Sequence, residues 1–296
     1  MIVNPVRQMK KLEKDLRRWC ADPTKDWREK IDKTLRQWLA SSHPRAAPVA
    51  ARQLDVLANF HAHHGALAIL KGRVEGWADI DLVLHYEWWH FRIEPGDNGA
   101  TNAALALAHA MVFEEESMAG WLAERLIQSL DEDTFLGRSW QLAPFGAFML
   151  KLWAMHRGLP DVDVKRPHVS PLGVYERVLE TWAKPNELRL ALGEACDYHL
   201  AQSWTAKGYP PFVRSPYQMF PVDILAIAIV RRDLGLEMPK VEHPLLSTPL
   251  ATPPPREQRP RMKRPDPLLE QVIAKARETG FLRDDSDAEA RGHERQ

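Results

Sequence analysis

Apolar residues recur at steps of three and four along most of the chain. The first two such stripes are Met9, Leu12, Leu16 and Trp19, then Trp27, Ile31, Leu35 and Trp38. This spacing places each stripe on one face of an α-helix. Breakers such as Gly72 and Pro185 divide the chain into further predicted helices. These helices lie at about 46–71, 74–93, 101–113, 116–130, 141–157, 172–184, 186–204 and 220–234.

Strands are not predicted, because Val and Ile are sparse and no long run alternates between apolar and polar residues. The chain is therefore expected to be all-α. Short links between consecutive helices favour antiparallel hairpins, packed as an irregular bundle or a curved stack.

The pattern changes after Pro239, where closely spaced prolines remove backbone donors and disfavour helix. We predict one helical domain over 1–239, a Pro-rich extended strap or linker over 240–266, and a short amphipathic helix over 267–282. A charged, disordered tail is expected over 283–296. The short helix either docks on the body of its own chain or binds a partner, and a homodimer is one such arrangement.

The charge balance and the cysteine content argue against some classes of binding partner and cellular location. Forty Lys and Arg residues balance forty Asp and Glu residues, so no global field favours nucleic acid or an anionic membrane. The basic run from Arg256 to Arg264 has no interleaved aromatic residues and is interpreted as a linker, solvated or laid over acidic patches of its own body. Two distant cysteines, no apolar leader and no long apolar run favour a cytoplasmic protein without membrane spans.

Two groups of residues could hold a metal ion. Glu87 and His90 form a Glu-x-x-His pair on one helical face, and His61 and His64 share a face of another helix. No second Glu-x-x-His occurs in the helical body, and a di-iron site needs two. We therefore predict no catalytic residue, cofactor or metal ligand, and keep a metal-dependent helical enzyme built on these four residues as the alternative.

Acidic and aromatic residues supply the candidate partner-binding surface. The residues are Glu114, Glu115, Glu116, Asp131, Glu132, Asp133 and Trp88. The acidic groups would frame an edge suited to a basic partner, and tryptophan is enriched at interfaces. A further alternative is a helical-repeat scaffold, because Gly76-Trp77 is echoed by Gly120-Trp121 at a spacing that suits a repeat of helix pairs.

The layout resembles the all-helical immunity proteins of bacterial polymorphic toxin systems, delivered by type VI or contact-dependent machinery. The resemblance lies in the Ala-Leu-rich stretch 103–108 followed by 114–122, and in the closing segment 220–236. It covers about residues 50 to 240 and carries no invariant motif, so it assigns no functional residue. It implies stoichiometric binding of a cognate protein toxin, which blocks the toxin's active site or its access to substrate.

Overall fold

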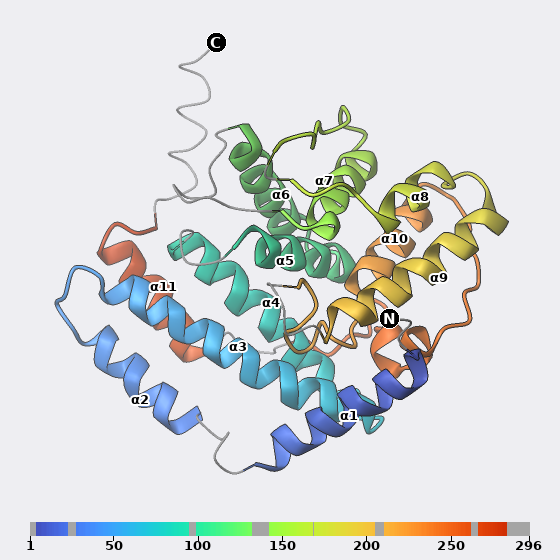
Figure 1. Ribbon diagram of the computed structural model, residues 1–296. Coiled ribbons are helices and arrows are strands. Elements are labelled where there is room, and N and C mark those ends of the chain that lie inside the picture. The colour runs from blue at the N-terminus through green and yellow to red at the C-terminus, as the bar shows by residue number, and fades with distance from the viewer. Residues whose placement is uncertain are drawn as a thin grey trace.

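The protein is all-α, as the hydrophobic spacing predicts. The computed structural model describes residues 4–22, 28–94, 99–131, 142–167, 169–204, 210–261 and 266–282. Within these ranges there are eleven α-helices and one isolated bridge between Leu142 and Val169 (Figure 1). The helices are α1 (Pro5–Ala21), α2 (Arg28–Leu39), α3 (Ala46–Leu70), α4 (Gly76–Ile93), α5 (Ala100–Phe113), α6 (Glu116–Asp131), α7 (Pro144–Arg157), α8 (Val174–Glu180), α9 (Pro185–Gln202), α10 (Val222–Asp233) and α11 (Pro267–Glu278).

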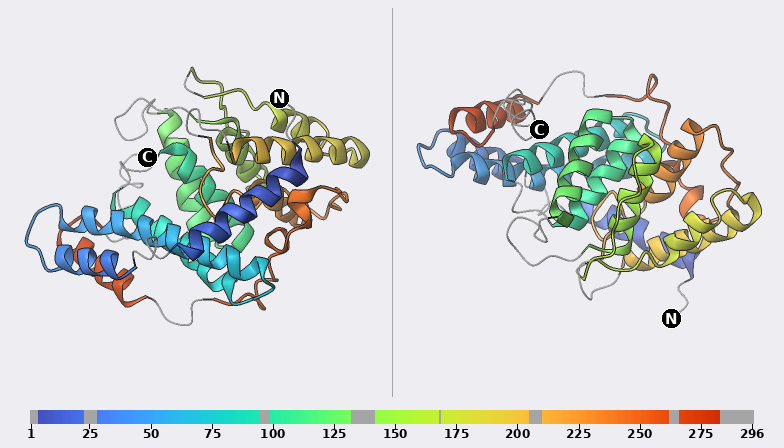
Figure 2. Two further views of the ribbon diagram at one scale, coloured as in Figure 1. Left: turned by 60° about the horizontal axis from the view of Figure 1, so that its bottom comes forward. Right: turned by 90° about the horizontal axis from the view of Figure 1, so that it is seen from above.

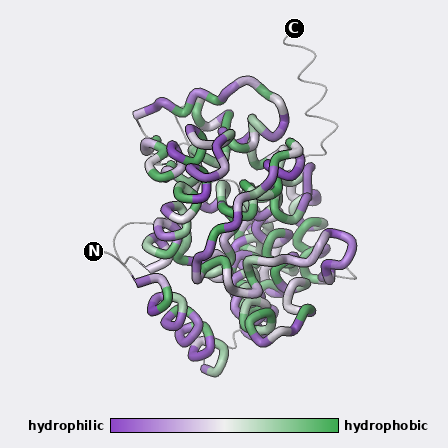
Figure 3. Tube along the Cα trace, turned by 90° about the vertical axis from the view of Figure 1, so that its right-hand side faces the viewer, coloured by the Kyte–Doolittle hydropathy of each residue, from purple (hydrophilic) through white to green (hydrophobic). Residues whose placement is uncertain are grey.

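The main core is built around α5. This helix has no charged residue, and all of its side chains from Ala103 to Phe113 are buried. A helix that is apolar on every side must be surrounded, and α4, α6, α7 and α10 pack around α5 (Figure 1). The outer helices alternate hydrophilic and hydrophobic residues along their turns, so that one face packs inward (Figure 3).

The α3–α4 hairpin depends on two glycines that allow very close approach. A Cβ atom added at Gly76 would lie 2.5 Å from the carbonyl oxygen of Gly65, and one added at Gly65 would lie 2.7 Å from the Cβ of Asp79. Gly120 is different, since the nearest atom to an added Cβ is a ring carbon of Trp153 at 3.8 Å. The two Gly-Trp pairs therefore have different surroundings, which removes the structural basis for treating them as repeat marks.

A second core joins α2, α3 and α4 to the C-terminal end of the described chain. Apolar residues of α2, α3 and α4 pack here against Leu268, Leu269 and Val272 of α11. Figure 2 shows α11 beside α2 and α3. The hydroxyl of Tyr86 on α4 donates a hydrogen bond to Asp266, which precedes α11, at 2.6 Å. The amphipathic helix thus docks on the body of its own chain.

The proline-rich segment lies against the main core. It contains two short 3-10 helices, η2 (Pro244–Ser247) and η3 (Pro249–Ala251), which bury Leu245 and Leu250. Arg259 is 6% exposed and donates to the carbonyl oxygen of Phe113, near the C-terminus of α5. This part of the strap is therefore bound to the body. The predicted tail over 283–296 lies outside the described residues, and none of the described helices has the length and apolar character needed to cross a membrane.

Candidate functional site

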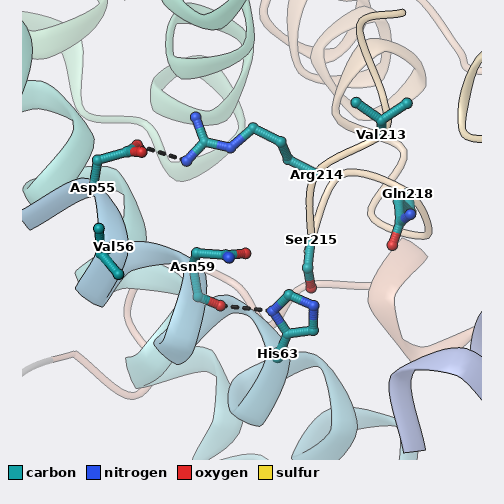
Figure 4. A pocket seen from close by; sticks show the side chains of 8 residues that line it. All are labelled: Asp55, Val56, Asn59, His63, Val213, Arg214, Ser215 and Gln218. Atoms are coloured by element: carbon teal, nitrogen blue, oxygen red, sulfur yellow. Dashed lines mark hydrogen bonds and ion pairs between the residues drawn. The ribbon is translucent and has the colours of Figure 1, made fainter. Parts of the chain in front are cut away.

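A groove opens between α3 and the irregular segment 210–221, which precedes α10. Its volume is about 440 Å³, and Figure 4 shows the side chains that line it. They are Asp55, Val56, Asn59 and His63 from α3, and Val213, Arg214, Ser215 and Gln218 from the segment. Val213 is 38% exposed at the surface, which leaves an apolar side chain beside a polar cavity.

Arg214 ties the two walls of the groove together. Its guanidinium Nη2 donates to Asp55 Oδ1 at 2.6 Å and lies 3.8 Å from Glu87 Oε1 (Figure 4 shows the Asp55 bond). Asp55 comes from α3 and Glu87 from α4, so one arginine from an irregular segment bridges both helices of the hairpin. Prolines at 210, 211 and 216 keep the segment out of helical conformation and allow Arg214 to project between them.

Glu87 is the buried end of this arrangement. It is 5% exposed and accepts a hydrogen bond from the Tyr217 hydroxyl at 2.7 Å. Burial raises the pKa of Glu87 to about 7, although Arg214 and the Tyr217 hydrogen bond oppose the rise. The same Tyr217 oxygen lies 3.1 Å from Nδ1 of His109, whose pKa is lowered by burial. A neutral His109 can donate this hydrogen from Nδ1.

A second buried network holds the segment from the other side. Nε2 of His199 lies 2.8 Å from the carbonyl oxygen of Tyr217, and its Nδ1 lies 2.9 Å from Asp223 Oδ1. The other oxygen of Asp223 accepts from the Tyr175 hydroxyl at 2.7 Å. His199, Asp223 and Tyr175 are fully buried on α9, α10 and α8. Segment 210–221 is therefore bound directly by side chains of four helices, α3, α4, α5 and α9, and the groove has a preformed floor.

His63 forms the far end of the groove. Its Nδ1 donates to the carbonyl oxygen of Asn59 at 2.7 Å, and its ring stacks on Trp19 of α1 with 3.8 Å between centroids. Burial lowers the pKa of His63 to about 4, so the ring is neutral near pH 7 and Nε2 carries a lone pair. The groove consequently offers both donors and acceptors for hydrogen bonds.

The structure does not bring the four residues of the metal hypothesis into a metal site. His61 bonds Asp79 at 2.7 Å, His64 packs on the ring of Phe60, and Glu87 bonds Tyr217. Within the described ranges, no group of three or more His, Cys, Asp and Glu side chains is arranged to hold a metal ion. The Glu-x-x-His spacing instead reflects the burial of both Glu87 and His90 on the inner face of α4.

The three consecutive glutamates form ion pairs within the chain. Glu114 pairs with Arg232 at 3.2 Å, Glu115 with Arg261 at 3.3 Å, and Glu116 with Arg157 at 3.5 Å. Glu114 follows the last residue of α5 in a left-handed conformation with φ 58°, and α6 begins two residues later at Glu116. The pairing of Glu115 with Arg261 agrees with the interpretation that the basic run lies over acidic residues of its own body.

The remaining candidate residues do not extend this acidic group. Asp131 is the last residue of α6, which separates it from Glu116 by the full length of that helix. Glu132 and Asp133 lie outside the described residues. Trp88 is half-buried against the main core, with the Arg92 guanidinium 5.1 Å from its ring. Of these, only the glutamates at 114–116 lie together in the described structure.

Sequence reasoning missed Asp55, Arg214 and Tyr217. Tyr217 and Glu87 are 130 residues apart and Arg214 and Asp55 are 159 apart, and no periodic pattern relates such positions. No known protein family, curated protein or solved structure matches this chain. The groove is therefore interpreted from its own geometry.

Proposed function

We propose that the protein binds another protein in a stoichiometric complex, as an immunity protein that neutralises a cognate toxin without catalysis of its own. The observation that carries this proposal is the preformed groove with the exposed Val213 at its rim. In this proposal the protein acts in the bacterial cytoplasm.

The fixed floor of the groove favours binding. Association costs free energy for every side chain and loop that must be ordered, and a surface that is already ordered avoids part of that cost. Here Arg214 is held by Asp55, and Tyr217 by Glu87 and His199. The volume of about 440 Å³ is that of a pocket for a small ligand, and such a space can receive side chains of a partner.

Co-expression with the product of the adjacent gene tests the proposal. We expect that product to be toxic alone, harmless when both proteins are made, and recovered with this protein in a 1:1 complex. If the adjacent product is harmless alone and does not co-purify, the proposal fails.

A single substitution tests whether the groove is the contact. Val213→Glu places a charge at its rim and should weaken the complex by at least tenfold. Leu190→Glu is the matched control, since Leu190 is an exposed apolar residue of α9 outside the groove lining. Equal affinity of the two variants would assign binding to another surface.

A further inference from the structure

One face of α1 carries a stripe of exposed basic residues. The helix contains six basic and two acidic side chains. The basic residues are Arg7, Lys10, Lys11, Lys14, Arg17 and Arg18, all of them exposed. At 3.6 residues per turn they fall within about one third of the helix circumference and span about 17 Å along its axis. Opposite them, Met9, Leu12 and Leu16 are buried in the main core.

Within the part of the chain that the structure describes, most of this charge is not paired. Arg17 pairs with Glu13 at 2.5 Å, but no other member of the stripe has a carboxylate within 4 Å among the described residues. Glutamates 114–116, by contrast, are each paired. The chain as a whole has no net charge, so α1 carries a local excess of positive charge. Figure 3 shows hydrophilic residues recurring along this helix, which begins beside the N label.

The stripe borders an exposed tryptophan and a small hollow. Trp204, two residues after the end of α9, is 44% exposed, and the Lys11 ammonium lies 3.3 Å from the centroid of its ring. Asn4, Arg7, Gln8, Lys11 and Trp204 line a hollow of about 220 Å³. Gln8 donates to the carbonyl oxygen of Leu200, which fixes α1 against α9 at this point. An aromatic ring in contact with a cation provides apolar contact area and charge at the same place.

The other end of α1 reaches the groove. Trp19 stacks on His63, which is a lining residue of the groove. Arg18 immediately precedes Trp19, so the basic stripe runs from the hollow at Trp204 towards the site of the proposed function. The Trp19–His63 contact therefore connects α1 to the wall of the groove.

The two acidic residues of α1 indicate the class of partner. Glu13 and Asp15 flank the stripe, one on each side, and both reach solvent. The uniform negative charge of a nucleic-acid backbone or an anionic bilayer would meet these carboxylates as well as the cations. A protein surface can present carboxylates to the stripe and basic groups to its flanks, which is the complementarity seen between protein partners.

We propose that the basic stripe of α1, with Trp204, is an interaction surface for an acidic face of the partner protein. This inference rests on the proposed function, because it names the chemistry of the toxin surface that the immunity protein binds. Exposed charges of this kind chiefly accelerate association, whereas the tryptophan contributes to the lifetime of the complex.

The test measures association and dissociation rates between the full chain and a catalytically inactive form of the adjacent gene product. We expect the double substitution Lys10→Glu with Lys14→Glu to lower the association rate constant at least tenfold at low salt and to reduce its salt dependence. Trp204→Ala should raise the dissociation rate constant at least tenfold. The matched control is Lys30→Glu with Lys33→Glu on α2, two exposed lysines of the next helix. All variants must keep the melting temperature of the unaltered protein, since none of these side chains is buried.

The outcomes separate the two proposals. A complex that forms with the unaltered protein and equally fast with the α1 variant overturns the inference and leaves the proposed function standing. No complex with the unaltered protein overturns both. A 20-base-pair DNA duplex and vesicles containing phosphatidylserine are tested in parallel. If either binds the unaltered protein and not the α1 variant, while the variant still binds the toxin normally, the stripe serves a polyanion and the inference is overturned.

Discussion

Replacing Glu87 by glutamine should change how the stability of the protein depends on pH. Burial raises the pKa of Glu87 from 4.5 to about 7. Between these values the folded protein retains a proton on Glu87 that the unfolded chain has released. Stability therefore falls as the pH rises through this window and stays level above it. The whole effect is about 3 kcal/mol, at 1.36 kcal/mol for each pH unit.

The Glu87→Gln variant removes this dependence and keeps an acceptor for the Tyr217 hydroxyl. About 2.5 kcal/mol of the stability that the unaltered protein loses through the ionisation of Glu87 is lost between pH 5 and pH 8. We expect the unaltered protein to lose that much more stability than the variant across this range, because the other titrating groups are common to both. The free energy of unfolding is measured by urea titration with tryptophan fluorescence at pH 5, 6, 7 and 8.

Glu124→Gln is the matched control. Glu124 is an exposed residue of α6, so its replacement should alter the free energy of unfolding by less than about 0.5 kcal/mol at every pH. If the stability difference between the Glu87→Gln variant and the unaltered protein is the same at all four pH values, Glu87 does not change its charge in this window. The description of its buried environment would then be wrong.

Three further substitutions test the packing. Gly76→Ala should force α3 and α4 apart and destabilise the protein by about 1–3 kcal/mol in thermal unfolding. Gly193 in α9 has open space around it, so Gly193→Ala should be neutral or should stabilise the protein by up to about 1 kcal/mol in the same measurement. Arg259→Ala leaves buried carbonyl oxygens without donors and should lower the free energy of unfolding, measured by urea titration, by about 1–3 kcal/mol. Arg256→Ala is the control, because Arg256 is exposed and its replacement should change this free energy little. Equal effects of the two substitutions would show that Arg259 does not hold the strap. Val272→Asp places a charge in the second core and should lower stability by more than about 3 kcal/mol, so an unchanged melting temperature would mean that α11 does not pack there in solution.

Local pattern was sufficient to predict most helices. The expected helix at 101–113 is α5 at Ala100–Phe113, and that at 186–204 is α9 at Pro185–Gln202. The main error is the helix expected at 172–184, since α8 covers only Val174–Glu180. Periodicity reports which face of a helix is apolar, and it works best where Pro or Gly also marks the ends. It says little about a short helix between two irregular segments.

The candidate site could not be predicted to the same extent. Glu87 was recognised as a residue of interest, but with His90 as its partner, because only neighbours along one helix are visible in a sequence. Its actual partners, Arg214 and Tyr217, come from an irregular segment more than 100 residues away. The acidic group at 114–116 shows the converse: the sequence singled these residues out correctly as a charged cluster, but their charge is already paired by arginines from distant elements.

The second core has a consequence for synthesis of the protein on the ribosome. Tyr86 and Asp266 are 180 residues apart, and the apolar faces of α2 and α3 are covered by a helix that follows Asp266. At about 5–20 residues per second, the ribosome needs roughly 10–40 s to make the intervening chain. During that interval these faces have no cover from α11, so nascent chains arrested before residue 267 should be bound by chaperones that recognise exposed apolar surface, and chains that include α11 should be released.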